Sequence, residues 1–296
     1  CAAHSILPLD QPGTASFGLI LALTGHAVGW PCAKGGSVKI IEALERCLRQ
    51  TGGEIQTGIM VRSLADLPSS RVVLFDLTPR QIAKIAGTHL PAGYVRKLER
   101  FVYGPGVFKI DWALSQPIPW SNPMCGAAAT VHVAGTAKEV LESEAALAEA
   151  RVSERPFVLL AQQSGFDPSR APDGKQTGWA YCHVPSGCTE DLTIRIEAQI
   201  ERFAPGFGET VLARHTMSPR QYEEYNPNFI GGDIGGGANT LKQFLFRPFF
   251  RWDPYCTPNE RLFLCSSSTP PGGGVHGMCG YWAARSALKR AFGRKE

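Results

Sequence analysis

A strand, a glycine-rich turn and a helix follow one another in residues 261–288, close to the C-terminal end of the chain. The segment reads RLFLC, then SSSTPPGGGVHGMCG, then YWAARSAL. Glycine lets the backbone approach a ligand closely, and the free N–H groups at a helix start suit an anion or a polarised carbonyl. This segment therefore predicts a ligand site built mainly from main-chain groups.

Three glycines of the turn, Gly272, Gly274 and Gly277, also satisfy the pattern G-x-G-x-x-G. In a Rossmann domain that pattern opens a βαβ unit, and an acidic residue follows about 20 residues later on a second strand. Here the sequence ends at Glu296, with no second strand after the helix. We therefore do not expect a complete NAD site, and a purely structural glycine turn stays open as an alternative.

The composition argues against several other classes of protein. The net charge of +4 is small and spread along the chain, so we expect no nucleic-acid partner. Nine cysteines are scattered without a C-x-x-C pair or a zinc-like spacing. This favours reduced thiols, a cytoplasmic protein and no metal site. The longest apolar run, residues 17–28, is shorter than the roughly 20 residues that a membrane span needs.

Helical and strand patterns in the first third predict an α/β arrangement. We expect an apolar helix within residues 1–30, then an amphipathic helix that begins after Ser37, has Ile40, Leu44 and Leu48 on one face, and ends at Gly52. Residues 54–58 and 60–61 are expected to be short strands. Residues 71–77 form a continuous apolar run, which predicts a parallel strand buried on both faces.

The middle of the chain mixes strands, helices and long loops. We expect strands at residues 105–114, 156–164 and 179–184, and helices at residues 136–150 and 190–204. Residues 167–177 contain prolines, Asp and Gly, which indicate a turn-rich loop. This pattern predicts a mixed-sheet domain inserted into the first one.

Three blocks of residues resemble the C-terminal part of phytoene-desaturase-like flavoproteins. The blocks are NPNFIGGDIGGG at residues 226–237, QFLFRP at residues 243–248, and residues 262–284 with the turn PPGGGVHG. The resemblance extends back through Gly35, Gly52 and Thr78, and so covers most of the chain. It implies an FAD-dependent oxidoreductase whose cofactor domain is discontinuous in sequence.

The resemblance implies a fold of class α/β, in part α+β: a partial Rossmann-like FAD/NAD(P)-binding domain with an inserted mixed-sheet substrate domain. Residues 31–95 would be the middle part of the FAD-binding domain, and residues 251–296 its C-terminal segment. Residues 1–30 and 96–250 would belong to the substrate domain. The family's N-terminal dinucleotide-binding motif is not in this sequence, which begins with Cys1 rather than Met. We therefore expect a fragment of a longer protein.

Matching positions imply the residues that contact the cofactor. Main-chain groups of Val61 would meet the adenine, and Thr78 and Pro79 would end the strand that faces the cofactor. The turn would lie at the pyrimidine edge of the flavin, where the dipole of the following helix stabilises the reduced, anionic ring. The residues of the turn are Gly274, Val275, His276, Gly277 and Met278.

Each of these positions also has an ordinary structural interpretation. Val61 fits a plain strand valine, Thr78 and Pro79 fit a helix N-cap followed by proline at the first helical position, and His276 fits a loop residue. Arg247 and His276 are the catalytic candidates, because a guanidinium can orient a polar group and an imidazole titrates near neutrality. Arg247 could instead be a salt-bridged arginine at a domain junction.

The resemblance implies dehydrogenation or saturation of carbon–carbon bonds in an apolar, carotenoid- or isoprenoid-like substrate, with hydride transfer at flavin N5. Such a substrate suggests a peripheral contact with a membrane. Two alternatives stay open: a non-enzymatic binding or assembly module that keeps the fold, and an amine-oxidase-like flavoenzyme. An aromatic cage beside the flavin would favour the amine oxidase, with Tyr281 and Trp282 as candidates.

Overall fold

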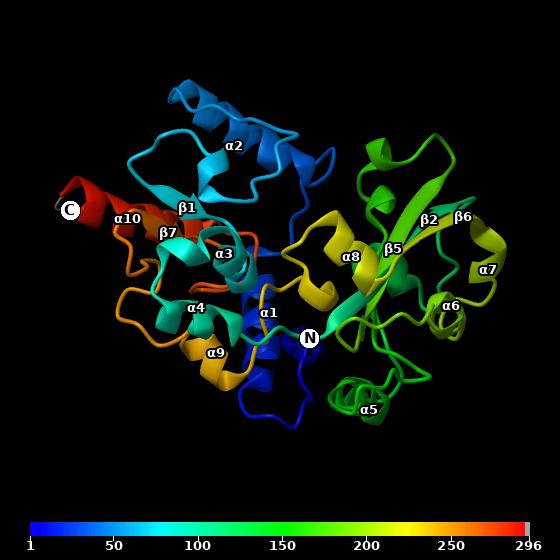
Figure 1. Ribbon diagram of the computed structural model, residues 1–296. Helices are drawn as coiled ribbons and strands as arrows, with labels where there is room; N and C mark the ends of the chain where they lie inside the picture. The colour runs from blue at the N-terminus through cyan, green and yellow to red at the C-terminus, as the bar shows by residue number, and fades with distance from the viewer. Residues whose placement is uncertain (294–296) are drawn as a thin grey trace. The chain divides into compact units, whose positions relative to one another are not determined.

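The computed structural model describes residues 1–293 and divides the chain into two compact units (Figure 1). Both units are discontinuous in sequence. The first consists of residues 1–58 and 107–218, and the second of residues 59–106 and those from 219 onward. The sequence placed boundaries after residues 30, 95 and 250, whereas the units divide after residues 58, 106 and 218. Which unit holds a cofactor and which a substrate stays a prediction.

The first unit is built on a five-stranded sheet with the strand order β3-β4-β5-β2-β6. The pairs β3–β4, β4–β5 and β2–β6 are antiparallel. The predicted strands and helices of the middle segment are confirmed, with shorter bounds except for β5, which begins three residues earlier than predicted and takes in the end of the expected loop. The strands are β2 (Gly106–Leu114), β3 (Thr130–Val133), β4 (Val158–Ala161), β5 (Gln176–Val184) and β6 (Val211–Met217), and the helices are α1 (Thr14–Val28), α2 (Val38–Gln50), α5 (Ala137–Ala148), α6 (Thr193–Glu201) and α7 (Phe207–Thr210), with short 3-10 turns η1 (Ala2–Ser5), η4 (Pro123–Ala127), η5 (Gln163–Gly165) and η6 (Pro168–Arg170).

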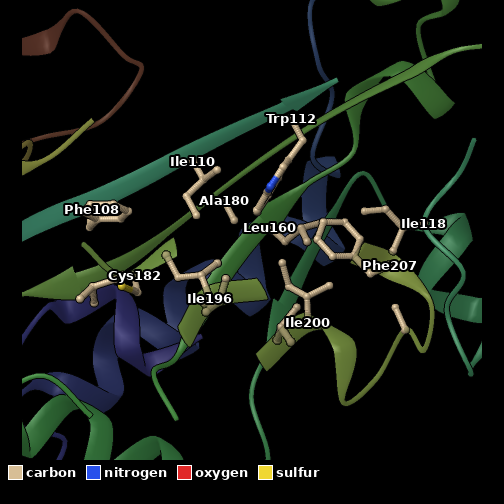
Figure 2. Close-up of a cluster of buried hydrophobic side chains, with 14 of the residues drawn as sticks. Phe108, Ile110, Trp112, Ile118, Leu160, Ala180, Cys182, Ile196, Ile200 and Phe207 are labelled. Atoms are coloured by element: carbon tan, nitrogen blue, oxygen red, sulfur yellow. The ribbon is translucent and has the colours of Figure 1, made fainter. Parts of the chain in front are cut away.

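One face of this sheet carries the main hydrophobic core (Figure 2). Alternate residues of β2 and β5, among them Ile110, Trp112 and Ala180, are buried there beside Ile196 of α6. The rings of Trp112 and Phe207 meet edge to face, with centroids 5.3 Å apart. Because successive side chains of a strand point to opposite faces, the intervening residues of β2 and β5 fall on the other face of the sheet.

The two predicted N-terminal helices are confirmed as α1 and α2. Gly52 has a φ of 84°, so the left-handed turn that ends α2 requires a glycine. Ser37 precedes α2, but its hydroxyl makes no capping hydrogen bond. The apolar stripe of α2 remains between 41% and 62% exposed at Ile40, Ile41, Leu44 and Leu48. The amphipathic pattern therefore predicts the helix correctly without predicting what its apolar face contacts.

The second unit holds a two-stranded parallel sheet, in which Val73, Leu74 and Phe75 pair with Leu262, Phe263 and Leu264. The predicted parallel direction of this strand is confirmed. Around it pack apolar residues such as Ile82 and Leu98. The elements are β1 (Val73–Phe75), β7 (Leu262–Leu264), α3 (Pro79–Ala86), α4 (Ala92–Glu99), α8 (Pro219–Tyr225), α9 (Leu241–Leu245) and α10 (Met278–Phe292), with 3-10 turns η2 (Leu64–Asp66), η3 (Gly87–His89) and η7 (Ile230–Gly232).

Two strand predictions are wrong in this region. Residues 54–58 and 60–61 are not strands, since within residues 1–293 no strand pairs with them. Ile59 and Met60 are accordingly 61% and 64% exposed. The strand predicted at 71–77 is only three residues long, and Leu74 is 37% exposed, so it is not buried on both faces. An apolar run reports hydrophobicity but not the number of neighbouring strands that would cover it.

Three further observations concern the cysteines, metal binding and membrane spans. The nine cysteines are free thiols. Within residues 1–293 no group of three or more His, Cys, Asp or Glu residues is arranged to hold a metal ion. In the same residues no helix combines the length and the apolar character that crossing a bilayer requires.

Candidate functional site

The candidate site lies at the carboxyl edge of the β1–β7 sheet, within the second unit. Parallel strands present their carboxyl ends at the same edge, which is where α/β folds commonly bind ligands. The backbone N–H of Cys265, just after β7, donates to the Phe75 carbonyl over 2.9 Å. Residues 76–79 leave β1 at this edge, and residues 265–277 leave β7 toward α10 (Figure 1).

The predicted strand, glycine turn and helix are confirmed as β7, residues 265–277 and α10. Gly272, Gly274 and Gly277 have φ values of 101°, 148° and 61°, which L-residues with a Cβ rarely adopt. Within residues 1–293 no backbone N–H of residues 273–277 donates to a backbone carbonyl. The turn therefore exposes a row of N–H groups at the start of a 15-residue helix.

The His276 side chain caps the start of α10. Its Nδ1 accepts a hydrogen bond from the Met278 N–H over 3.0 Å, so Met278, which the resemblance placed against the cofactor, already has a partner for its amide. With Nδ1 as the acceptor, a neutral imidazole carries its proton on Nε2. Both His276 and Val275 are exposed, Val275 to 91%. The imidazole thus caps the helix and presents an N–H donor at Nε2.

A second glycine turn, at residues 235–237, packs against the hydroxyl-rich segment that follows β7. The Ser268 hydroxyl donates to the Gly236 carbonyl over 2.7 Å. A Cβ on Gly236 would lie 2.1 Å from the Ser267 Oγ, and one on Gly237 would lie 2.3 Å from the Phe101 ring. These contacts explain why the sequence carries glycines there, since a side chain would push the two segments apart.

Asp233 holds this second turn from inside. Its carboxylate accepts hydrogen bonds from the backbone N–H groups of Gly104, Gly235 and Gly237 over 2.7, 2.7 and 2.8 Å. The side chain is almost fully buried. The predicted turn role of Asp233 is confirmed, because an Asp commonly binds the backbone N–H two residues on. Its bond to Gly104 has no signal in the sequence.

Arg247 is 3% exposed and lies beside the same turn. Its Nη1 donates to the Ser267 carbonyl over 3.0 Å. Its Nη2 donates to the carbonyls of Gly237 and Ala238 over 3.0 and 3.2 Å and to the Asn239 Oδ1 over 2.6 Å. Burial lowers the pKa of Arg247, and the charge of Asp233 opposes that shift.

The contacts of Arg247 favour a structural role over a catalytic one. Within residues 1–293 no carboxylate forms an ion pair with it, so it is not the salt-bridged arginine that the sequence left open. Instead it joins the segment after β7 to the second glycine turn. A Cβ on Gly272 would lie 3.8 Å from its Nη1, which places Arg247 behind the first glycine turn as well.

Gln243 reinforces this arrangement, and the sequence did not single it out. Its Oε1 accepts from the Val102 N–H over 2.9 Å. Its Nε2 donates to the carbonyls of Val102 and Ala238 over 2.8 and 3.0 Å. A glutamine at the middle of α9 looks like any polar helix residue, so only the tertiary structure identifies it as a clamp.

Of the cofactor-binding positions predicted near β1, Thr78 and Pro79 lie at the carboxyl edge of the sheet, and Val61 does not. Thr78 and Pro79 occupy the N-cap and first position of α3, as expected. The Thr78 N–H donates to the Asn228 Oδ1 over 2.8 Å, while within the described chain its buried Oγ1 has no hydrogen-bond partner. Val61 lies in an unpaired segment, and among residues 1–293 it makes no hydrogen bond to the other predicted site residues.

Two thiols also line this edge, Cys279 buried and Cys265 half-buried, and sequence reasoning gave them no role. The Cys279 Sγ donates to the carbonyls of Thr269 and Gly272 over 3.5 and 3.4 Å. Burial raises the pKa of Cys265 to about 12, with Asp76 and Cys279 adding to the shift. Cys265 therefore behaves as a neutral packing group rather than a nucleophile.

Comparison with known proteins adds a coarse relationship. No protein-family model matches the chain. The chain is similar to pyridine nucleotide-disulfide oxidoreductase domain-containing protein 2 of Rattus norvegicus and of Mus musculus, at 29% identity over 273 residues in each case. These alignments cover 81% of this chain and 44% of each relative, so the chain spans less than half the length of the curated relatives it matches.

A solved structure of an oxidoreductase from Methanosarcina mazei is also similar, with a TM-score of 0.55 and 16% identity over 86% of this chain and 55% of that one. At that identity the likeness concerns the fold alone, and it is consistent with the expected mixed α/β class. The comparisons relate the chain to part of two curated oxidoreductase-domain proteins and to the fold of one solved oxidoreductase. They do not support phytoene desaturases in particular.

Proposed function

We propose that the chain is part of an FAD-dependent oxidoreductase that dehydrogenates or saturates a carbon–carbon bond of an apolar substrate. The observation that carries this proposal is the glycine turn between β7 and α10, whose N–H groups at residues 273–277 lack backbone acceptors within residues 1–293. The general similarity to oxidoreductases supports the same reaction class. The carotenoid- or isoprenoid-like substrate rests on the sequence resemblance alone.

The donor set fits the pyrimidine edge of a flavin, which carries nitrogen and carbonyl acceptors. Gly274, Val275, His276 and Gly277 would hold that edge with main-chain N–H groups. The start of α10 would add the positive end of a helix dipole, worth about 0.3–1 kcal/mol toward a nearby negative charge. When bound, FAD supplies two-electron hydride chemistry, and the protein supplies binding and orientation.

The role of His276 follows from its hydrogen bond with the Met278 N–H. Dehydrogenation removes a hydride from one carbon and a proton from its neighbour, and saturation adds both. Because Nδ1 accepts from Met278, the neutral ring can donate a hydrogen bond from Nε2 but has no free nitrogen to accept a proton. Giving up the Nε2 proton would leave an imidazolate anion, so in this proposal His276 orients a bound group by hydrogen bonding and does not carry the proton of the reaction. Arg247, which is buried behind the turn, has a positioning role in this proposal.

The amine-oxidase alternative has a specific observation against it. Tyr281 and Trp282 of α10 have ring centroids 5.2 Å apart and meet edge to face, with an interplanar angle of 78°. The guanidinium of Arg285 lies 5.7 Å and 4.8 Å from the two ring centroids. A fixed cation over both rings repels a substrate ammonium, so this pair does not favour an amine.

Peripheral contact with a membrane remains a proposal, as does the absence of a nucleic-acid partner. The exposed rings of Phe246, Phe250 and Trp252 support the membrane contact, with Trp252 96% exposed and Phe250 64% exposed. Aromatic side chains of this kind favour membrane–water interfaces. Sedimentation of the chain with lipid vesicles, beside a Trp252→Ser variant, tests it.

The proposed function is tested by the visible absorption spectrum of the purified chain after FAD is added and free FAD is removed. A longer form, extended at the N-terminus to the length of the relatives, is measured beside it. Bound flavin in either form supports the proposal, and its absence from both refutes it in favour of a non-enzymatic module. His276→Asn, which keeps an acceptor near Met278 but removes the imidazole, should retain flavin and slow turnover, because the Nε2 donor is lost.

A further inference from the structure

The face of the five-stranded sheet opposite the main core carries an unusual group of side chains. Lys109 and Asp111 come from β2, and Trp179 and Tyr181 come from β5, the neighbouring strand. All four side chains are partly exposed, while the residues between them are buried in the core. Aromatic residues are common in strands, so the case for a ligand rests on how these four side chains are arranged.

The two rings are parallel. Their centroids lie 6.2 Å apart, with an angle of 9° between the ring planes. The cross-strand neighbours of these residues on β4 are Ala161 and Leu159, which are small or apolar. Burial raises the pKa of Tyr181 to about 12, so its phenol stays neutral at physiological pH. The two rings are therefore uncharged, and the Glu144 carboxylate also acts to raise the pKa of Tyr181.

The charge beside it comes from a fixed ammonium. The Lys109 Nζ lies 5.6 Å from the Trp179 ring centroid. It donates to both carboxylate oxygens of Asp111, over 2.5 and 2.6 Å. An ammonium has three N–H donors, and the carboxylate takes two. Within residues 1–293 no other acceptor bonds to Lys109, so one donor remains beside the Trp179 ring.

The Lys109–Asp111 pair beside the Trp179 ring would treat cationic, anionic and neutral ligands differently. An organic ammonium would compete with Lys109 for the same ring and carboxylate, and would be repelled by it. A strongly anionic group would meet the Asp111 carboxylate, which is 41% exposed. A flat neutral molecule with one oxygen acceptor avoids both conflicts, because it can stack on an aromatic ring and accept a hydrogen bond from the ammonium.

We infer that Lys109, Trp179 and Tyr181 form a binding site for a flat, conjugated carbonyl group, which stacks on the aromatic rings and accepts a hydrogen bond from the Lys109 ammonium. This inference rests on the proposed function for its meaning: it names the substrate class as carbonyl compounds in which the carbon–carbon double bond beside the carbonyl is formed or reduced. Asp111 is a positioning residue, because it holds the ammonium in place without touching the ligand.

The test is equilibrium dialysis of the full chain, without FAD, against three related probes. trans-Cinnamamide is flat, conjugated and neutral, 3-phenylpropanamide lacks the conjugation, and cinnamylamine replaces the carbonyl by a cation. We expect trans-cinnamamide to bind roughly tenfold more tightly than either of the others, a difference of about 1.4 kcal/mol. Equal binding of the three probes, or no binding of trans-cinnamamide, overturns the inference.

Variants locate the site. Lys109→Met keeps an apolar stem but loses the donor, and Trp179→Leu loses the ring; each should weaken binding of trans-cinnamamide about five- to tenfold. Trp179→Phe keeps a ring and should bind within about threefold of the native chain, which guards against a variant that fails to fold. Tyr225→Leu removes an exposed aromatic residue elsewhere and should change nothing. Unchanged binding by Trp179→Leu refutes the site.

The flavin spectrum separates this inference from the proposed function. Flavin binding without trans-cinnamamide binding refutes the carbonyl site and leaves the flavoenzyme proposal intact. Binding of trans-cinnamamide by a protein that binds no flavin in either form confirms the site and refutes the oxidoreductase proposal.

Discussion

Arg247 offers the sharpest test of the site's construction, because the sequence suggested catalysis and the structure shows a buried clamp. In Arg247→Met the stem keeps most of its apolar packing and the guanidinium is lost. The carbonyls of Ser267, Gly237 and Ala238 and the Asn239 side-chain oxygen then lose the guanidinium donor, and Ala238 keeps its bond from Gln243. The perturbation therefore acts on the two glycine turns and the segment after β7 together.

The magnitude follows from two opposed effects. A buried hydrogen bond that involves a charged group contributes about 1.5–3 kcal/mol, and the four contacts use one N–H of Nη1 and the two of Nη2, so the gross loss is at least about 4.5 kcal/mol. Removing the guanidinium also removes the desolvation penalty of a buried ion, which is several kcal/mol. We expect a net loss on the order of 3 kcal/mol in the free energy of unfolding, a large share of the roughly 5–15 kcal/mol of a typical domain.

The assay is urea unfolding followed by circular dichroism, with Arg220→Met as the matched control. Arg220 lies in the same unit, and its side chain is 79% exposed in an ion pair with Glu224. We expect no measurable change for the control, because exposed ion pairs contribute little. Arg247→Lys should recover only part of the loss, since an ammonium lacks the planar fork of donors. An unfolding free energy of Arg247→Met within about 0.5 kcal/mol of the native chain would refute this reasoning.

Three further predictions concern packing, pH and thiol chemistry. Gly237→Ala should lower the free energy of unfolding by about 2–4 kcal/mol in the same assay, because the φ of 135° is strained for alanine and the new Cβ would clash with the Phe101 ring. Gly126→Ala is the control and should be neutral, because the space around Gly126 is open. Equal effects of the two variants would contradict the structure. The His4 Nε2 lies 2.9 Å from the His132 Nε2, and burial, then His132, lowers the pKa of His4 from 6.5 to about 4. The folded state therefore favours the neutral ring, and its contribution is present above pH 6.5 and lost as the pH falls toward 4. His132→Asn should flatten the decline in unfolding free energy over that range by on the order of 1 kcal/mol, after a discount for partial exposure, and an unchanged pH profile would argue against the pair. Cys265, with a pKa of about 12, should stay unmodified by iodoacetamide at pH 8 until urea is added. Mass spectrometry of the digested chain can check this. Rapid labelling of the native chain would contradict its partial burial.

The sequence by itself determined the local elements, because those depend on short-range physical chemistry. A proline after Thr78 and the 3.6-residue period after Ser37 predicted the starts of α3 and α2 correctly. The strand, glycine turn and helix near the C-terminal end were predicted as a unit. The turn could be predicted from composition because Gly272 and Gly277 have positive φ values, which favour glycine over other residues.

Tertiary structure decided which elements become strands and what each polar side chain contacts. Residues 54–61 have strand-like composition, yet a strand exists only where another strand pairs with it. Arg247, Asp233 and Gln243 bond to backbone groups, and backbone groups leave no trace in the identity of their residues. The aromatic face beside Lys109 likewise depends on β2 and β5 being neighbours in the sheet, a pairing between segments that lie far apart in the sequence.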